Sequence, residues 1–167
     1  GQLGNGATTT TDQDEPVLVD LPTGRTAVEI SGFWDHTCAI LDNGSLMCWG
    51  MGGTGRLGNG DDANQHEPVY VNLPYGRTAV AVSPGRLQTC AILDNGSLMC
   101  WGSDAFGMLG NGATTTADQH EPVYVDLPTG RTAASVDTGR EHTCAILDNR
   151  SLMCWGSDAY GMLGNGA

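Results

Sequence analysis

Lysine is absent from this 167-residue chain, and long apolar runs are absent as well. The seven basic side chains are all arginines, and against 19 acidic residues they leave a formal net charge of -12. Such a surface repels phosphate backbones and anionic lipid headgroups, which argues against nucleic-acid binding and against docking on membranes. No run of about 18 apolar residues occurs, so we expect no membrane insertion.

Aromatic residues are also scarce, at 6% of the chain, whereas glycine occurs 25 times. Apolar residues do not recur at the 3.6-residue spacing of a helix for more than about one turn. The chain instead alternates short apolar segments with turn-forming Gly, Pro, Asn and Asp, which is typical of an all-β protein.

An internal repeat organises the whole sequence. The motif Leu-Gly-Asn-Gly begins at positions 3, 57, 109 and 163, and the eight or ten residues that follow it are the main place where the copies differ in length. Because the chain begins and ends at the same phase of the repeat, we expect it to be a piece of a longer array or a processed product. The predicted units are 1–56, 57–108 and 109–162, with 163–167 as the start of a next unit.

Each unit contains four short segments with strand character. In the first unit these are 16–19, 27–30, 36–41 and 45–49. Four strands in about 50 residues is the size of one propeller blade. We therefore expect an all-β fold of four-stranded antiparallel blades, about three blades plus a partial one, left open or completed by other chains.

The six cysteines occur as three pairs, each pair spanning ten residues. If the first pair face each other across a hairpin, residues 42–44 form a three-residue loop, with Gly44 where a left-handed backbone is needed. Arg150 replaces this glycine in the third unit. Metal binding by the cysteines would need closer spacing or companion histidines in every copy, so we predict disulfides and an oxidising compartment. The predicted disulfides are Cys38 with Cys48, Cys90 with Cys100, and Cys144 with Cys154.

The order of motifs resembles a known family. Gly-x-x-x-His-Thr-Cys-Ala-Ile-Leu is followed by Asp-Asn-Gly-Ser, Cys-Trp-Gly, Gly-x-Leu-Gly-Asn-Gly and a Pro-Val strand. This order resembles the regulator-of-chromosome-condensation repeat, in the secreted, cysteine-paired version of microbial extracellular proteins, and the resemblance covers essentially the whole chain. It implies a β-propeller, usually of seven blades. Three blades cannot close such a ring, so something else must cover the exposed end faces.

The hairpin loops and the variable loops contain candidate glycosylation sites. Asn43, Asn95 and Asn149 each begin an Asn-x-Ser acceptor motif, although Asn-Gly-Ser is also good hairpin chemistry. Threonine runs in the variable loops are candidate O-glycan carriers or simply solvated loops. The O-glycosylation candidates are Thr8, Thr9, Thr10, Thr11, Thr114, Thr115 and Thr116.

Three further sets of repeated residues favour structural roles. His36 and His142 align with Gln88, which excludes proton transfer as a shared function. The arginine of each Gly-Arg-Thr-Ala motif suggests an ion pair, with Asp20 and Asp126 as the nearest candidate partners. The tryptophan after each second cysteine favours packing between blades over sugar stacking. These arginines are Arg25, Arg77 and Arg131, and these tryptophans are Trp49, Trp101 and Trp155.

No cofactor is expected. Oxygen-rich loops do bind calcium, and the acidic loop residues are the only candidates, but they form no repeated set of ligands. The calcium candidates are Asp12, Asp14, Glu15, Asp61 and Asp62.

Near-identical units argue against a catalytic site, because such a site requires one copy to differ. We therefore expect a non-catalytic extracellular or cell-surface protein that assembles from propeller blades, as in a filament, sheath or surface appendage. Its partners are other copies of itself or the continuation of a longer chain. The alternative is a discrete secreted propeller that binds a protein or a glycan through the loops 7–16, 61–68 and 113–122.

Overall fold

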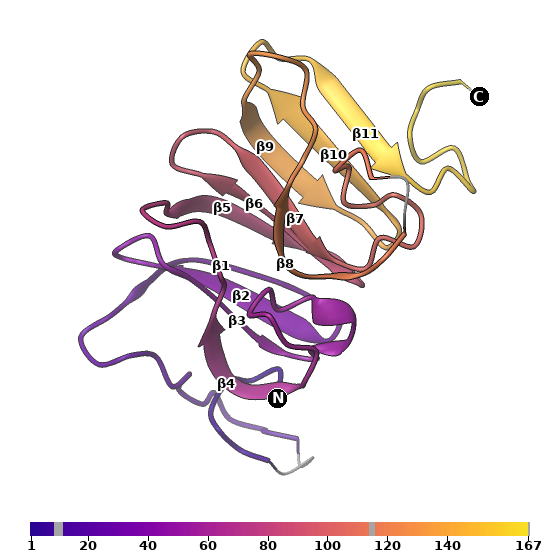
Figure 1. The fold of residues 1–167 in the computed structure, drawn as a ribbon. Helices are drawn as coiled ribbons and strands as arrows, with labels where there is room; N and C mark the ends of the chain where they lie inside the picture. Colours follow the sequence, from indigo (N-terminus) through magenta and orange to yellow (C-terminus); the bar gives the residue numbers. More distant parts are fainter. Residues whose placement is uncertain (9–11, 114–115, 167) are drawn as a thin grey trace.

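The computed structural model describes residues 1–8, 12–113 and 116–166, and it is a stack of three antiparallel sheets (Figure 1). The expected all-β fold and antiparallel blades are confirmed; the described part contains a single short helical turn, η1 (Gly53–Gly55). No helix in these residues has the length and apolar character needed to cross a bilayer. Blade 1 consists of β1 (Ala27–Phe33), β2 (His36–Leu41), β3 (Leu46–Gly50) and β4 (Gln65–Tyr70); blade 2 of β5 (Ala79–Pro84), β6 (Gln88–Leu93), β7 (Leu98–Gly102) and β8 (Gln119–Tyr124); blade 3 of β9 (Ala133–Thr138), β10 (His142–Leu147) and β11 (Leu152–Gly156).

Each four-stranded sheet takes its last strand from the start of the following sequence unit. The order β1-β2-β3-β4 shows that the Pro-Val segment of the second unit pairs with β3 of blade 1, and β8 pairs with β7 in the same way. The expectation of a strand at 16–19 within blade 1 is therefore wrong. The equivalents of this segment are outer strands of a preceding sheet, and residues 16–19 have no such sheet beside them among the described residues.

The predicted hairpin register is confirmed in all three blades. Cys38 lies opposite Cys48, and Ile40 lies opposite Leu46. The N–H of Gly44 donates to the carbonyl of Leu41 at 2.8 Å, and Gly44 has a φ of 76°. Arg150 adopts the same left-handed conformation, with a φ of 69°, which costs a residue with a Cβ about 1 kcal/mol.

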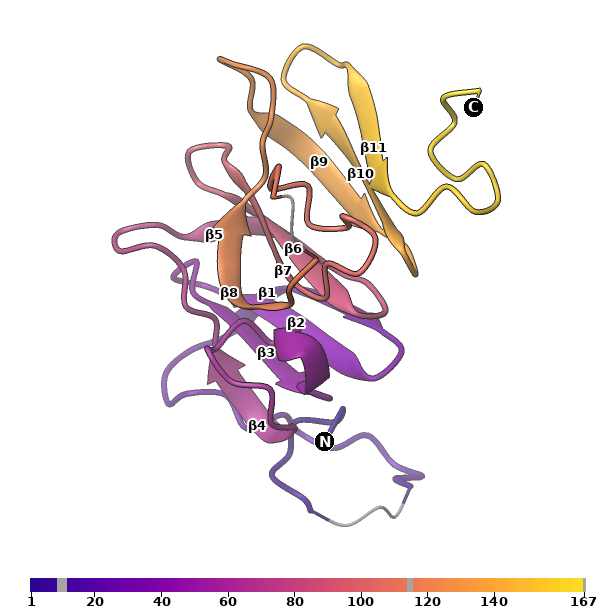
Figure 2. The same cartoon turned by 45° about the vertical axis from the view of Figure 1, so that its right-hand side comes forward.

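Consecutive blades pack face to face around the inner strands. β5 lies against β1 and β2, and β9 lies against β5 and β6, so blade 2 is enclosed on both sides (Figure 2). We call the side of a blade that meets the following blade its forward face, and the opposite side its rear face. The forward face of blade 1 presents Cys38, Ile40, Leu46 and Cys48 to a rear face of blade 2 that contains Ala79, Val82, Ala91 and Trp101.

A repeated loop segment fills each junction between blades. We call the segments 2–6, 56–60, 108–112 and 162–166 wedges, since each begins one residue before Leu-Gly-Asn-Gly. Leu57 and Leu109 are fully buried between blades. A Cβ on Gly58 would lie 2.6 Å from the indole nitrogen of Trp101, so the glycine allows the wedge to lie directly on the ring.

Candidate functional site

The disulfides lie at the forward faces of the blades. Cys38 bonds to Cys48, Cys90 to Cys100 and Cys144 to Cys154, as the sequence predicts. The first two are fully buried by the following blade, whereas the cysteines of the third are only partly buried. The disulfides therefore stabilise the hairpins from within the junctions.

The three candidate N-glycosylation sites lie on exposed hairpin loops. The Oδ1 atoms of Asn43, Asn95 and Asn149 accept the N–H two residues later at 3.0–3.1 Å. This contact gives the asparagine side chain a structural function in the turn. The geometry leaves each side chain exposed, and glycosylation stays a prediction.

The variable loops contain the remaining modification and calcium candidates. Thr8 and Thr116 are exposed. The other five threonine candidates, Thr9, Thr10, Thr11, Thr114 and Thr115, lie outside the described residues. Across residues 1–8, 12–113 and 116–166, no three His, Cys, Asp or Glu side chains come together in an arrangement that could hold a metal ion.

The repeated arginines form ion pairs, but with partners other than those expected. Arg77 lies 3.3 Å from Asp94, and the equivalent pairs are Arg25 with Asp42 and Arg131 with Asp148. The prediction of Asp20 and Asp126 was wrong because it took near neighbours in sequence. Each arginine precedes the first strand of a blade, and its partner is the aspartate that directly follows the second strand of the same blade. An aspartate occupies this position in all three units.

His36 has a structural role. Its Nε2 atom lies 2.8 Å from Oγ1 of Thr89 in the next blade, and the side chain is 1% exposed. Burial, and to a lesser extent the positive charge of Arg56, lowers the pKa of His36 from 6.5 to about 3. Thr89 also donates to the carbonyl of Arg56 at 2.8 Å, so this buried hydroxyl is bonded within the junction and is not exposed to a substrate.

The repeated tryptophans also serve the junctions. The indole N–H of Trp101 donates to the carbonyl of Arg56 at 2.9 Å, and that of Trp155 donates to the carbonyl of Met108 at 2.8 Å. Trp49 and Trp101 are at most 1% exposed. The expected packing between blades is confirmed, and these two rings are not available for stacking on sugars.

An exposed group of aromatic and charged side chains lies at the end of the blades that bears the β1–β2, β5–β6 and β9–β10 turns. We call this end the turn end; the opposite end bears the hairpin loops. The guanidinium of Arg86 lies 5.1 Å from the centre of the Trp34 ring, a cation–π contact between blades 1 and 2. Arg86 also reaches Glu141 of blade 3 at 4.0 Å, and Glu141 pairs with Arg140 at 3.3 Å. One row of contacts thus links all three blades.

Two members of this row are well exposed. The Trp34 residue is 68% exposed, and the Arg140 side chain is 62% exposed. The buried Arg56 contacts the backbone of this row, because its Nη1 donates to the carbonyl of Arg86 at 2.8 Å. Burial lowers the pKa of Arg56 from its usual value, and the carboxylate of Asp35 opposes this shift. The turn end therefore holds aromatic and cationic groups in fixed positions.

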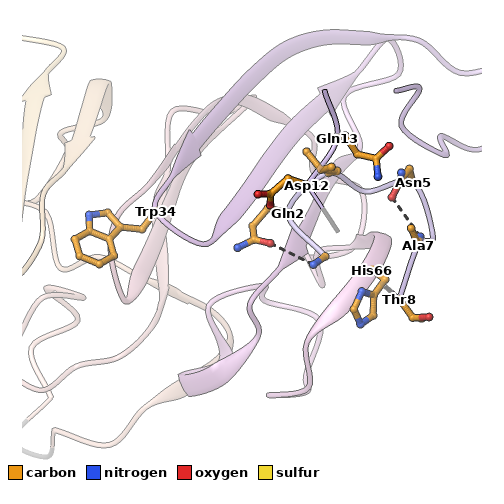
Figure 3. A pocket seen from close by; sticks show the side chains of 10 residues that line it. Gln2, Asn5, Ala7, Thr8, Asp12, Gln13, Trp34 and His66 are labelled. Atoms are coloured by element: carbon orange, nitrogen blue, oxygen red, sulfur yellow. Dashed lines mark hydrogen bonds between the residues drawn. The ribbon is translucent and has the colours of Figure 1, made fainter. Parts of the chain in front are cut away.

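A hollow of about 550 Å³ adjoins this row (Figure 3). Trp34 lines one side of it, and residues of the first wedge line the other with Asp12 and His66. The side chains drawn include three amides, a hydroxyl, the Asp12 carboxylate and the His66 imidazole, all of which are able to form hydrogen bonds.

Sequence reasoning did not identify the turn-end row. Trp34, Arg86 and Arg140 occupy the same phase of successive units, and the absence of a shared residue type there suggested no common site. The usable signal was the stacking itself: residues at the same phase of adjacent blades become neighbours, so different residue types can form one contact row.

Comparison with known proteins assigns the repeat. The model of the regulator of chromosome condensation (RCC1) repeat matches residues 43–92 and 95–146, and a second model with the same description matches residues 133–161. This chain belongs to the RCC1 repeat family. Within the family, it is 30% identical over 167 residues to the ultraviolet-B receptor UVR8 of Arabidopsis thaliana, covering 99% of this chain and 37% of the receptor. It is 29% identical over 156 residues to the human E3 ubiquitin-protein ligase HERC2, covering 92% of this chain and 3% of the ligase.

Two solved structures share the fold of this chain. Yeast RCC1 (Prp20), in a crystal structure with Kap60, superposes with a TM-score of 0.70 at 19% identity, covering 79% of this chain and 32% of that one. Human WBSCR16 gives a TM-score of 0.70 at 19% identity over 78% of this chain and 33% of its own. The RCC1 repeats described here therefore span about a third or less of these relatives.

Proposed function

We propose that this RCC1-repeat segment is a non-catalytic protein-binding module whose partner docks on the turn end. The observation that carries the proposal is the row from Trp34 through Arg86 to Glu141 and Arg140, which joins three blades. Tryptophan and arginine are enriched at the energetic centres of protein interfaces. They stand here at a position where otherwise near-identical units differ.

Electrostatics supports the same end. Only seven cationic side chains offset 19 acidic ones, and three of the seven pair with aspartates at the hairpin end. Arg56, Arg86 and Arg140 are concentrated at the turn end. A carboxylate on a partner would be repelled by most of this surface and attracted here, which fixes the orientation of docking.

The relatives are consistent with a binding role. Prp20p of Saccharomyces cerevisiae has binding properties to Gsp1p and histones, and yeast RCC1 has been crystallised in a complex with Kap60. Those partners belong to those proteins. For this chain they support the coarser proposal that an RCC1-type propeller binds a protein.

Affinity capture with matched variants tests the proposal. The variant R86A/R140A removes two arginines from blades 2 and 3 at the turn end, and R77A/R131A removes two from the same blades at the hairpin end. We compare the amount of a partner protein that each variant captures from an extract of the native host. We expect the first variant to capture about tenfold less than the wild type, and the second to capture the wild-type amount within about twofold. Equal capture by both variants would refute the turn-end proposal.

A second candidate is the self-assembling role expected from the sequence. The observation in its favour is that the outer faces of blades 1 and 3 remain apolar and uncovered, with Ile30 and Leu152 both 67% exposed. Three disulfides favour an extracellular or cell-surface location, where such bonds persist. The location can be tested on protein from its native host by comparing its intact mass before and after enzymatic deglycosylation. A loss of mass would show occupied Asn-x-Ser motifs, which mark passage through a secretory pathway.

A further inference from the structure

The loop that leads into each blade is the same in all three units except at one position. Each copy reads Leu-Pro-x-Gly-Arg-Thr-Ala, and the variable residue is Thr23 in the first unit, Tyr75 in the second and Thr129 in the third. Tyr75 is fully exposed. Exposure of a single aromatic ring is common on protein surfaces and identifies no site by itself. Here, however, the ring borders a hollow.

This hollow has a volume of about 210 Å³ and lies at the hairpin end. It is lined only by residues between 45 and 77, where the chain passes from β4 of blade 1 to β5 of blade 2, so it belongs to an internal junction. Sites for drug-sized ligands measure about 300–1,000 Å³, so this hollow suits one ring of a ligand whose other parts stay in solvent. The lining residues that matter below are Ser45, Tyr70, Leu73, Pro74, Tyr75 and Arg77.

The lining combines apolar surface with free hydroxyl groups. Tyr70 is 51% exposed, and Leu73 and Pro74 are half-buried beside it. Within residues 1–8, 12–113 and 116–166, the hydroxyls of Ser45, Tyr70 and Tyr75 form no hydrogen bond to the protein. Each of these hydroxyls can both donate and accept. The hollow therefore offers an apolar platform edged by three unpaired hydroxyls.

The charged groups at this corner are already paired. Arg77 lies 3.3 Å from Asp94, and Asp42, in the same hairpin loop as Ser45, lies 3.4 Å from Arg25. An anionic ligand is repelled by the net charge of -12, and a cationic ligand would meet the guanidinium of Arg77 in the lining. These charges favour a neutral ligand that has an apolar face and several hydroxyls.

The backbone around the hollow does not favour an extended peptide. The N–H of Leu73 donates to the carbonyl of Val71 at 2.8 Å, and the N–H of Arg77 donates to the carbonyl of Pro74 at 3.0 Å. Pro74 itself has no N–H. A peptide that binds as an added strand needs a row of free backbone groups, whereas a sugar ring uses its C–H face and its hydroxyls.

We propose that the hollow binds one ring of a neutral oligosaccharide. The C–H face of the ring lies on Tyr75, and its hydroxyls bond to the hydroxyls of Ser45 and Tyr70. Tyrosine suits this function because it gives a rigid, amphipathic contact at a low cost in conformational entropy. The site is separate from the turn end and adds a second class of ligand to the proposed protein partner.

The third unit contains the same corner without the tyrosine. All the other lining positions of the hollow have identical residues there, and Tyr124, the equivalent of Tyr70, is 54% exposed. Thr129 is the single difference. The substitution Y75T should therefore remove the site, and T129Y should create a second one. Both variants place a residue type that the same loop already contains in another unit, so both should fold.

Two-dimensional amide NMR spectra of the full chain, titrated with cellopentaose, chitopentaose and mannopentaose, test the proposal. We expect one of these neutral probes to shift the amide of Gly76 with a Kd of about 1 mM or tighter, and Y75T to weaken binding about tenfold or more. In T129Y the same probe should also shift the amide of Gly130. Y160T is the matched control, because Tyr160 is 90% exposed in the loop after β11, and it should leave binding unchanged.

Two results would overturn the proposal. One is the absence of any shift at Gly76 with all three oligosaccharides at about 10 mM, whether or not a proline decapeptide shifts it. The other is binding that Y75T leaves unchanged and that T129Y does not extend to Gly130. The dispersion of the spectra shows directly that each variant is folded. The outcome is independent of the turn-end proposal, which the arginine variants test separately.

Discussion

His36 is the residue at which burial and ionisation conflict most strongly. Its pKa is lowered to about 3 by burial and by Arg56, whereas an unfolded chain holds its histidines near 6.5. Because the unfolded state binds the proton more readily, the contribution of His36 to the free energy of unfolding is fully present above about pH 6.5. This contribution falls as the pH drops toward 3. The slope from this one residue is about 1.4 kcal/mol per pH unit.

The substitution H36Q tests this effect with a residue that the molecule already uses. Gln88 occupies the same position in blade 2 and donates from Nε2 to carbonyls of blade 3 at 3.2 and 3.3 Å. We expect H36Q to be less sensitive to acid between pH 6.5 and 4, measured by urea unfolding at a series of pH values. An unchanged pH dependence would show that other groups control acid unfolding.

Residue-level predictions succeeded where the controlling contact is local in sequence. The cysteine pairs, the loop 42–44 and the left-handed Arg150 all follow from spacing within one hairpin. The predicted partners of the repeated arginines were wrong, and the contact of Trp34 with Arg86 was missed. Both depend on which strands and blades become neighbours, and a single unit does not contain that information.

At the scale of elements, the wedges carry much of the packing between blades. Leu57 is fully buried in the first junction, whereas Leu3, at the same position of the first wedge, is 48% exposed. We expect L57A to lower the free energy of unfolding by about 2–4 kcal/mol and L3A by less than about 1 kcal/mol, as measured by urea unfolding. Similar losses from both variants would mean that the wedge leucine stabilises its own loop and not the junction.

The three disulfides should differ in how fast they are reduced. Cys38–Cys48 and Cys90–Cys100 are covered by the following blade, whereas Cys144–Cys154 lies on an open face. Thiol–disulfide exchange requires access to sulfur, so we expect the third bond to be reduced first under native conditions. Brief treatment with a reductant, alkylation and peptide mass analysis measure the order.

A concentration series adds a control to the reduction experiment. If copies of the chain associate through the forward face of blade 3, as the second candidate function expects, the third disulfide becomes protected as the protein concentration rises. Simultaneous reduction of all three bonds would instead indicate that reduction follows global unfolding.

The sequence predicted the strands of the hairpins and failed on the outer strand. Residues 16–19 have the same Pro-Val character as β4 and β8, but a strand needs a partner, and β4 and β8 pair with the unit before their own. Apolar pattern alone identifies a segment able to pair; tertiary position decides whether it does so.

At the scale of the whole molecule, the dominant long-range force is self-repulsion. The net charge is -12, and the repeated Arg–Asp pairs are about 40% exposed, so they contribute little attraction. We expect the melting temperature to rise as NaCl increases from about 10 to 200 mM, because the Debye length falls from about 30 Å to about 7 Å over this range. The same rise in KCl would exclude a specific sodium effect, and a fall in melting temperature with salt would show that attractive pairs dominate.

The ten-residue separation within each cysteine pair also governs how the chain acquires its disulfides. Six cysteines permit fifteen complete pairings, but each native partner is ten residues away, whereas the nearest cysteine of another hairpin is 42 residues away, from Cys48 to Cys90. Loop-closure entropy alone favours the shorter loop by about 1.3 kcal/mol, or roughly eightfold in effective concentration. The cysteines of each hairpin thus form their native disulfide locally. A longer array would add further hairpins that oxidise independently, and the preference for the native pairing within each hairpin would not change.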